Sequence, residues 1–451
     1  MKKTIDIPFL TLFNTLTDKQ EKFSAQGSSV SLYACGITPY DYAHLGHGRC
    51  YVTFDVIYRL LKFLGYTVVY CRNFTDIDDK LIRRADKEYN DPEQYLRIAQ
   101  RFIETFLEDM KALGCLSPDF EPRVTLHIPE IIAFIEGLVT LEKAYVTPLG
   151  DVYYSIESFP DYGKLSKRTP DELKVGARIS VRGDKRNPAD FALWKAADEA
   201  PGWDSPWGFG RPGWHIECSA MSKAYLGDNI DIHAGGMDLI FPHHENEIAQ
   251  SEGLHDKQFA RYWVHNAFVR LNEEKMSKSL GNFFTLRDIF EHYDPMVIRY
   301  YYVTHHYRNP LDFKEDDLRG AVKSYQRLCR FFARIPTASL EELHKNVSPL
   351  VESLIAALCD DINGAKFFGI LFDNLSQEGL NEASLVKGVL VHLLGLTMEP
   401  STKDEVVITP EIECLLTERE EARKDKDWKK ADEIREKLRL LGVEFQDKKL
   451  G

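Results

Sequence analysis

The sequence predicts an α/β protein in which an open, mostly parallel sheet with an insertion is followed by an α-helical bundle and a small C-terminal domain. Three observations lead to this prediction. Strand-like and helix-like segments alternate near the N-terminus, helical spacing with almost no strand signal follows residue 316, and a charged tail follows a break near residue 400. The 451 residues, 44% of them hydrophobic, suffice for about two to four domains.

The first structural unit is a strand, a helix and a second strand. Residues 30–36 alternate apolar and small side chains like a strand. Residues 54–65 carry apolar side chains at helical spacing, and Gly65 can end that helix in a left-handed conformation. Residues 66–71 indicate the second strand, so the pairing should be parallel with a right-handed crossover. Cys35 is then expected at the carboxyl edge of the sheet, where open α/β sheets bind ligands.

The remaining elements follow from interruptions of this pattern. Prolines between about residues 116 and 210 predict an insertion into the sheet domain. Strand and helix signals resume near residue 230, and apolar residues at helical spacing after residue 316 predict a bundle. The expected domains are residues 1–315, 316–403 and 404–451.

Composition and charge limit the possible binding partners and the cellular location of the protein. The net charge of -13 argues against non-specific nucleic-acid binding, although a local basic groove is still allowed. There is no signal-peptide core and no apolar run of membrane-spanning length, so we expect a cytoplasmic protein without a membrane partner. Eight scattered cysteines indicate reduced thiols. Trp428 among basic residues of the tail is typical of a solvated helix with a small core, or of nucleic-acid contact.

Four side chains offer a set of ligands that suits zinc: Cys35, Cys218, His243 and Glu247. Pro242 predicts a helix start, and the i,i+4 spacing would put His243 and Glu247 on one helix face. The alternative is that the cysteines belong to the core while His243 and Glu247 form a hydrogen-bonded pair. On these residues alone, both interpretations stay open.

Two motifs suit a polyphosphate. His44-Leu45-Gly46-His47 begins the first helix, where unpaired N–H groups attract anions and Gly46 permits a close approach. Lys275-Met276-Ser277-Lys278-Ser279 places two lysines on a loop that could close on the phosphates of ATP. Either motif alone is typical of exposed residues, but the two together favour ATP chemistry.

The two motifs resemble the signatures of class I aminoacyl-tRNA synthetases, and the chain as a whole resembles the cysteinyl-tRNA synthetase family. The resemblance covers nearly the whole chain and includes four further stretches, residues 33–41, 72–80, 210–219 and 231–247. It implies a Rossmann-like catalytic domain with a stem-contact region at about residues 265–315, a tRNA-binding bundle, and an anticodon-binding domain. The family's last domain typically continues further, so we expect a shortened one here, ending at Gly451.

The resemblance also implies the activity. It implies a monomeric ligase that activates cysteine with ATP to cysteinyl-adenylate and transfers it to the 3′ end of tRNA(Cys), with one zinc ion per chain and magnesium accompanying ATP. The implied residues are Cys35, Cys218, His243 and Glu247 for zinc; His44, His47, Lys275 and Lys278 for catalysis; these and Gly46 for ATP; and Thr75, Trp214 and Asp238 for the substrate.

Zinc would select the substrate. A pocket alone separates near-isosteres by only about 1–3 kcal/mol, whereas zinc prefers thiolate and so favours cysteine over serine. Four protein ligands leave no open position, so zinc must gain a fifth ligand or loosen one, and Glu247 is the ligand expected to loosen. We expect His215, His233 and His244 to lie outside the first coordination shell.

Two alternatives stay open at this level. One is a cysteine-activating ligase of the mycothiol type, with a small amine as acceptor, whose relatives lack a large C-terminal extension. The other is a zinc-stabilised nucleic-acid-binding protein without catalysis. Cysteine-dependent exchange of pyrophosphate into ATP separates the second alternative from both ligases, and charging of tRNA separates the two ligases.

Overall fold

The fold comes from a computed structural model. It describes residues 9–168, 185–271, 274–275, 284–346, 348–375, 382–399, 415, 418–419, 422 and 427–440. The chain forms two compact units, one of Met1–Arg287 with Pro295–Pro400 and the other of Asp288–Asp294 with Ser401–Gly451. Among the helices described, none has the length and apolar character needed to cross a membrane.

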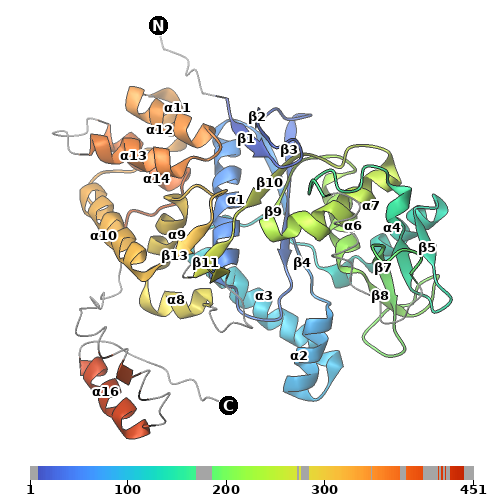
Figure 1. Ribbon diagram of the computed structural model, residues 1–451. Helices are drawn as coiled ribbons and strands as arrows, with labels where there is room; N and C mark the ends of the chain where they lie inside the picture. The colour runs from blue at the N-terminus through green and yellow to red at the C-terminus, as the bar shows by residue number, and fades with distance from the viewer. Residues whose placement is uncertain are drawn as a thin grey trace. The chain divides into compact units, whose positions relative to one another are not determined.

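A four-stranded parallel sheet forms the centre of the larger unit (Figure 1). Its strand order is β10-β9-β3-β4, with β3 at Ser29–Ile37, β4 at Thr67–Phe74, β9 at Ile230–Gly236 and β10 at Ala260–Asn266. In this sheet Tyr33 pairs with Cys71 of β4 on one side and with His233 of β9 on the other. The predicted parallel α/β core is confirmed, and β4 continues past residue 71 because residues 72–74 are buried as well.

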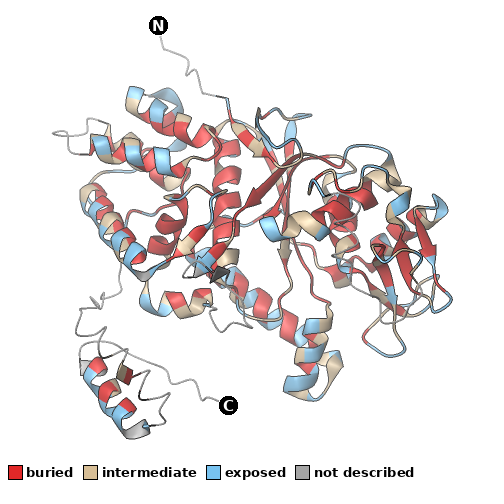
Figure 2. Ribbon diagram, in the orientation of Figure 1, coloured by how far each residue is buried: buried red, intermediate tan, exposed pale blue. Residues whose placement is uncertain are grey.

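Helix α1 (Leu45–Phe63) connects β3 to β4 and is largely buried. Gly65 follows it with φ +89°, the left-handed conformation predicted for the end of this helix. Helices α6 (Trp214–Leu226) and α7 (Glu245–His255) pack against each other, and α6 also contacts β3 and β4. Figure 2 shows that the strands of the central sheet and most of α1 are buried.

The region between β4 and α6 contains a second sheet. This antiparallel sheet has the order β5-β6-β7-β8, with β5 at Ala144–Val146, β6 at Val152–Tyr154, β7 at Phe191–Ala196 and β8 at Gly210–Pro212. The helices of the region between β4 and α6 are α2 (Asp79–Tyr89), η1 (Pro92–Gln94), α3 (Tyr95–Ala112), η2 (Val124–Leu126), α4 (Ile128–Thr140) and η3 (Ile156–Ser158). Four short strands separated by up to about 40 residues gave little alternation to predict this sheet.

A third sheet has the order β12-β11-β13, formed by Glu274–Lys275, Val269–Leu271 and Leu311–Phe313, and a hairpin of β1 (Thr11–Asn14) and β2 (Lys19–Lys22) lies near the N-terminus. The helices that follow are α8 (Leu286–His292), α9 (Pro295–Val303), α10 (Glu315–Phe332), α11 (Leu340–Lys345), α12 (Pro349–Cys359), α13 (Gly364–Asn374), α14 (Ala383–His392) and α16 (Trp428–Leu440). The described part of residues 316–399 is therefore helical, as predicted.

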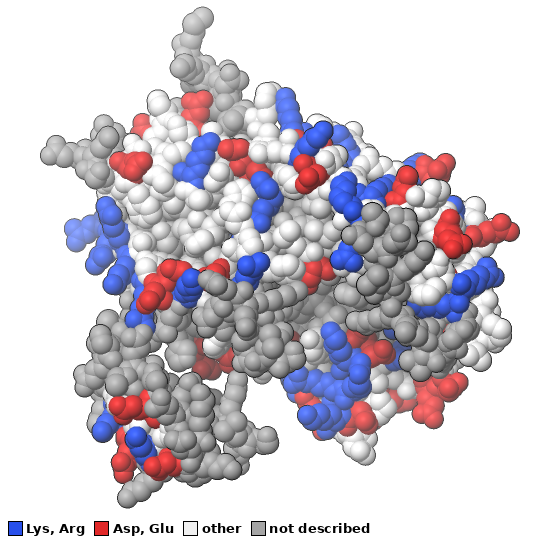
Figure 3. Space-filling view, in the orientation of Figure 1, with Lys and Arg blue, Asp and Glu red and all other residues white. Residues whose placement is uncertain are grey.

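Two expectations from composition have structural counterparts. The seven cysteines of the described ranges are all free thiols. Acidic and basic side chains are interspersed over the face drawn in Figure 3, so the net charge of -13 does not form one acidic field there. The side chain of Trp428 and the residues after Leu440 lie outside the described part of the chain.

Candidate active site

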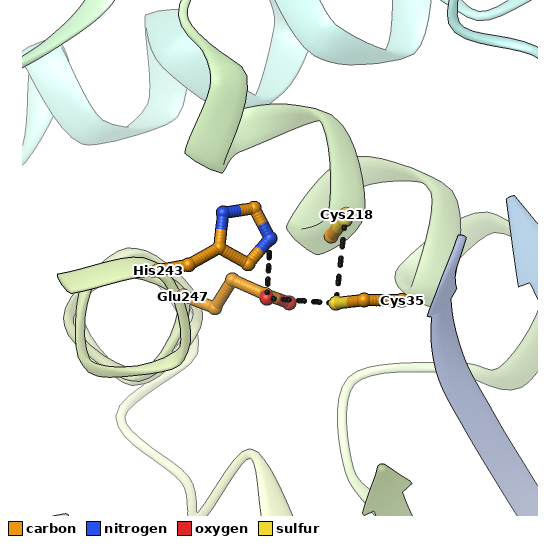
Figure 4. Close-up of side chains that lie close together, drawn as sticks. All are labelled: Cys35, Cys218, His243 and Glu247. Atoms are coloured by element: carbon orange, nitrogen blue, oxygen red, sulfur yellow. Dashed lines mark hydrogen bonds and ion pairs between the residues drawn. The ribbon is translucent and has the colours of Figure 1, made fainter. Parts of the chain in front are cut away.

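Four side chains from three parts of the sheet domain meet in the buried interior (Figure 4). Cys35 lies near the carboxyl end of β3, Cys218 on α6, and Glu247 in the first turn of α7. His243 lies in the η5 turn (Ile240–His244), which stands between η4 (Met237–Leu239) and α7. Within η5, the backbone of Phe241 is not helical. The predicted i,i+4 contact forms, because His243 Nε2 lies 3.1 Å from Glu247 Oε1.

Three of the six ligand–ligand distances within this set lie close to the edges of a zinc tetrahedron. Two Zn–S bonds of about 2.3 Å at the tetrahedral angle place the sulfurs about 3.8 Å apart, and the corresponding S–O and N–O edges are about 3.6 and 3.4 Å. Here Cys35 Sγ lies 3.8 Å from Cys218 Sγ and 3.5 Å from Glu247 Oε1. With the 3.1 Å between His243 Nε2 and Glu247 Oε1, three edges agree within about 0.3 Å. The residues present fit a tetrahedral metal ion.

A second group of four overlaps the first. Cys35 and Glu247 are joined in it by His233 and His244. This group fits less well, because His244 Nε2 lies 4.0 Å from Glu247 Oε1. Metal-bound imidazoles also usually bond through their other nitrogen. His243 meets that requirement through His215 Nδ1 at 2.9 Å, whereas His233 Nδ1 has no hydrogen-bond partner among the described residues.

The electrostatics of the cluster favour a cation. The hydrogen bond with Cys35 lowers the pKa of the Cys218 thiol to about 6, while burial raises the pKa of Cys35. Burial opposes the charged form of His243, but its contacts with Cys218 and Glu247 outweigh this and raise its pKa to about 10. Burial is likewise outweighed at Glu247, whose pKa falls to about 2 beside His233 and His243. A bound metal would therefore displace protons from Cys35 and His243.

Two partners of this cluster, Asn73 and His265, were not predicted from the sequence. Asn73, near the end of β4, accepts a hydrogen bond from Gly36 N through Oδ1 at 2.8 Å, and the same oxygen lies 3.7 Å from Cys218 Sγ. His244 Nε2 lies 3.3 Å from Cys35 Sγ, and its Nδ1 lies 2.7 Å from His265 Nε2. The available signal was position, since Asn73 and His265 lie near the carboxyl ends of β4 and β10, at the same edge of the parallel sheet as Cys35.

A cavity of about 370 Å³ opens beside this cluster. Cys35 and Trp214 line it together with His44, Gly46 and His47. One member of the predicted metal-ligand set, Cys35, thus lines the same cavity as the predicted phosphate motif. A cavity of this size suits a small organic ligand.

The two motif histidines organise the start of α1. His44 is the N-cap residue, and its Nδ1 accepts a hydrogen bond from His47 N at 3.3 Å, while His47 Nδ1 accepts one from His44 N at 3.2 Å. Their rings stack with centroids 3.6 Å apart. This capping box holds both imidazoles at the positive end of the helix dipole, where an anionic group is favoured.

The first residue of the lysine motif and a residue after it are each connected to parts of the chain that line the same cavity. Lys275 belongs to β12, which pairs with β11, and Val269 of β11 lines the cavity. After the motif, Thr285 forms an antiparallel bridge with His44. Lys278 lies outside the described residues, as does the side chain of Lys275.

The three predicted substrate residues lie in different surroundings. Trp214 is 41% exposed, lines the cavity, and has its ring 4.3 Å from that of His243. Asp238 also lines the cavity. Thr75 is buried, and its hydroxyl donates a hydrogen bond to Glu217 Oε2 at 2.9 Å.

Comparison with known proteins gives two family matches. The catalytic domain of the class I (C) tRNA synthetases matches residues 22–323, and the cysteinyl-tRNA ligase anticodon-binding domain matches residues 407–450. The chain is 44% identical to the cysteine–tRNA ligase of Pelobacter propionicus, with 98% of each chain covered. It is 46% identical to the cysteine–tRNA ligase of Geobacillus thermodenitrificans, with 97% of each covered.

Solved structures share the fold at low sequence identity. The methionyl-tRNA synthetase of Mycobacterium tuberculosis, in complex with methionyl-adenylate, superposes with a TM-score of 0.57 at 13% identity, covering 82% of this chain and 90% of that one. The LeuRS of Agrobacterium radiobacter K84 in a ternary complex gives 0.57 at 10% identity, covering 83% and 84%. These likenesses concern the fold alone.

Proposed function

The chain belongs to the cysteine–tRNA ligases of the class I tRNA synthetases, and we propose that it activates cysteine in the cavity between Cys35 and His44. The enzyme is a ligase that joins cysteine to tRNA in two steps. The cysteine carboxylate attacks the α-phosphate of ATP, giving cysteinyl-adenylate and pyrophosphate. The acyl group then passes to a ribose hydroxyl of the 3′-terminal adenosine, and AMP leaves. The observation that supports the location is the shared cavity, which Cys35 and the histidine motif line together.

The phosphate end works by charge and position. His44 and His47 stand at the N-terminus of α1, where the positive end of the helix dipole stabilises negative charge that builds up on the phosphates. Gly46 lets the nucleotide approach the helix start, and Lys275 and Lys278 supply further positive charge. Magnesium accompanying ATP is the expected counter-ion.

We propose zinc as the metal held by Cys35, Cys218, His243 and Glu247. The support is the agreement of three ligand–ligand distances with tetrahedral edges, together with complete burial of a mixed sulfur, nitrogen and oxygen set. When bound, zinc supplies a bond to the substrate thiolate that the hydroxyl of serine cannot match, because zinc prefers sulfur and thiolate forms more readily than alkoxide.

Of the four residues that would hold the metal, Glu247 would be the one to yield its place to the substrate sulfur. Its Oε1 faces His243 and Cys35, while its Oε2 lies 2.8 Å from His233 Nε2. A carboxylate that already has a second partner keeps a hydrogen bond when its other oxygen leaves the metal. In this proposal His233 would hold Glu247 in place without binding the metal itself.

The remaining substrate contacts rest on position. Trp214 forms the cavity wall next to His243, which suits contact with the cysteine side chain. Asp238 offers a carboxylate to the substrate amino group or the ribose. Thr75 acts through Glu217, to which it donates, and the two hold the start of α6 that carries Cys218.

We propose tRNA(Cys) as the acceptor. The match of residues 407–450 to an anticodon-binding domain supports a tRNA acceptor over a small amine, which has no anticodon to read. A monomeric state and a cytoplasmic location stay predictions from the sequence.

Two assays on one preparation test the proposal. Cysteine-dependent exchange of labelled pyrophosphate into ATP reports adenylate formation, and charging of tRNA(Cys) reports transfer. We expect both, with serine inactive and one zinc ion per chain by elemental analysis. Exchange without charging would overturn the assignment of the acceptor, and absence of exchange in zinc-loaded protein would overturn the assignment of the cavity.

A further inference from the structure

Arg49 is a buried cation on the helix that begins with the histidine motif. It lies on α1, two residues after His47, and is 1% exposed. Its guanidinium donates four hydrogen bonds, all to backbone carbonyls. The acceptors are Ala267 O at 3.1 Å, Phe268 O at 3.1 Å, His306 O at 3.0 Å and Asn309 O at 2.6 Å.

These carbonyls belong to two segments that enter neighbouring strands. Ala267 and Phe268 line the cavity and lead directly into β11, and the segment containing His306 and Asn309 leads into β13. The two strands are paired in parallel, with Val269 opposite Leu311. One guanidinium group therefore joins α1 to the segments that lead into two of the three strands of this small sheet.

The same sheet carries the first lysine of the downstream motif. Strand β12 pairs with β11, with Lys275 opposite Arg270. A series of contacts thus connects the histidine motif on α1, through Arg49, to the cavity wall and then to the strand that contains Lys275. Because parallel segments are held from a single point, a change at Arg49 should move the wall and the lysine strand together.

Arginine suits this position for a geometric reason. Its planar group presents donors in a fixed fork, whereas lysine offers a single ammonium that can meet fewer carbonyls at once. No carboxylate of the described residues is within ion-pair distance of Arg49, so the carbonyls alone compensate its burial. Burial lowers the pKa of Arg49 only to about 10, which leaves it charged at neutral pH.

We propose that Arg49 is a positioning residue for adenylate formation, setting the distance between the histidine motif on α1 and the lysine strand β12. The inference rests on the proposed function, in which both motifs act on the same phosphates. It assigns Arg49 no contact with substrate. Its effect should therefore fall on the nucleotide step and leave the cysteine end of the cavity unaffected.

The test is Arg49→Lys in the full-length, zinc-loaded protein, measured by cysteine-dependent pyrophosphate exchange. Misplacement of a catalytic group by about 1 Å can cost about 100-fold in rate. We expect kcat/KM for ATP to fall about 100-fold, with KM for cysteine within about twofold and zinc content unchanged.

A matched control is Arg299→Lys. Arg299 on α9 is also fully buried, and it donates to Leu394 O at 2.6 Å, to Leu113 O at 2.9 Å and to Asp55. None of these acceptors lines the cavity. We expect Arg299→Lys to lower the unfolding midpoint by about as much as Arg49→Lys does. Its kcat/KM for ATP should change less than about threefold.

A double-mutant cycle with Lys275→Ala gives a readout that a purely structural role would not change. If Arg49 acts through the lysine strand, Arg49→Lys should cost less in the Lys275→Ala background than in the wild type. Additive effects, or equal effects of Arg49→Lys and Arg299→Lys on both substrates, would overturn the proposal. A wild-type protein without exchange activity would instead count against the proposed function.

If Arg49→Lys does not fold, Arg49→Gln takes its place, because the amide keeps a donor toward the carbonyls without the charge. An unchanged kcat/KM for ATP in a folded variant would overturn the proposal. So would failure of both variants to fold while Arg299→Lys folds, since Arg49 would then be a determinant of folding.

Discussion

Gly36 is the position where one added methyl group should disrupt the proposed zinc site. It follows Cys35 at the end of β3, and its N–H donates to Asn73 Oδ1 at 2.8 Å. A Cβ atom at residue 36 would lie 1.4 Å from the backbone oxygen of Asn73 and 2.5 Å from its carbonyl carbon. Because real Cβ contacts stay above 3.0 Å and the neighbour is backbone, β3 and β4 would have to move apart by about 1.6 Å.

That displacement can be compared with what a metal site tolerates. Metal–ligand distances must stay within about 0.2 Å of their ideal values, so a shift several times larger at Cys35 removes it from the tetrahedron. We expect Gly36→Ala to bind zinc at least about 100-fold more weakly, a loss of about 2.8 kcal/mol. Competition with a chromophoric chelator measures the affinity, and circular dichroism confirms that the variant is folded.

Two controls separate this effect from a general loss of stability. Gly364→Ala should be destabilised without weaker zinc binding, because its Cβ would lie 1.8 Å from Val303 O, in the region of α9 and α13. Gly369→Ala has nothing within 4 Å of its Cβ and should change neither property adversely. Zinc affinity in folded Gly36→Ala equal to that of the wild type would refute the geometry described for the site.

Three further predictions address selection, catalysis and pH. Cys218→Ser should lower zinc content and weaken cysteine binding more than ATP binding; unchanged discrimination against serine would contradict the role given to the metal. Lys278→Ala should slow pyrophosphate exchange while zinc content stays at one per chain, and a rate equal to that of the wild type would exclude Lys278 from catalysis. Burial raises the pKa of Asp109 to about 6 despite its ion pair with Arg287. Folding therefore favours the protonated form of Asp109. Its contribution to the free energy of unfolding is fully present below pH 3.8 and is lost as pH rises through about 6. Chemical denaturation of Asp109→Asn should accordingly show the variant gaining up to about 3 kcal/mol relative to the wild type between pH 4 and pH 7, whereas a constant difference would count against the raised pKa.

Local patterns predicted the core of the fold well. The unit β3–α1–β4 was predicted because its strands and helix are continuous in sequence and have distinct periods. Gly65 marked the end of α1 correctly, since a left-handed residue there favours glycine. The antiparallel sheet β5-β6-β7-β8 was not predicted, because its pairing joins short strands that come together only in the folded protein.

The candidate site likewise contains residues that the sequence predicted and contacts that it did not. Sequence reasoning named the set Cys35, Cys218, His243 and Glu247, and the structure brings these four side chains together. It could not reveal the supporting contacts, because the bond of His243 to His215 and the burial of Arg49 against four carbonyls depend on segments that meet only after folding. Residue types indicate the chemistry of the site, whereas contacts between segments distant in sequence are seen only in the folded structure.

The central claim is that the metal centre selects cysteine by its sulfur, and counting sulfur ligands tests this most directly. X-ray absorption at the zinc edge distinguishes Zn–S bonds of about 2.3 Å from the shorter bonds to nitrogen and oxygen. The zinc-loaded protein should show two sulfur ligands alone or with serine, and three with cysteine. A count of two that cysteine does not change would contradict the claim.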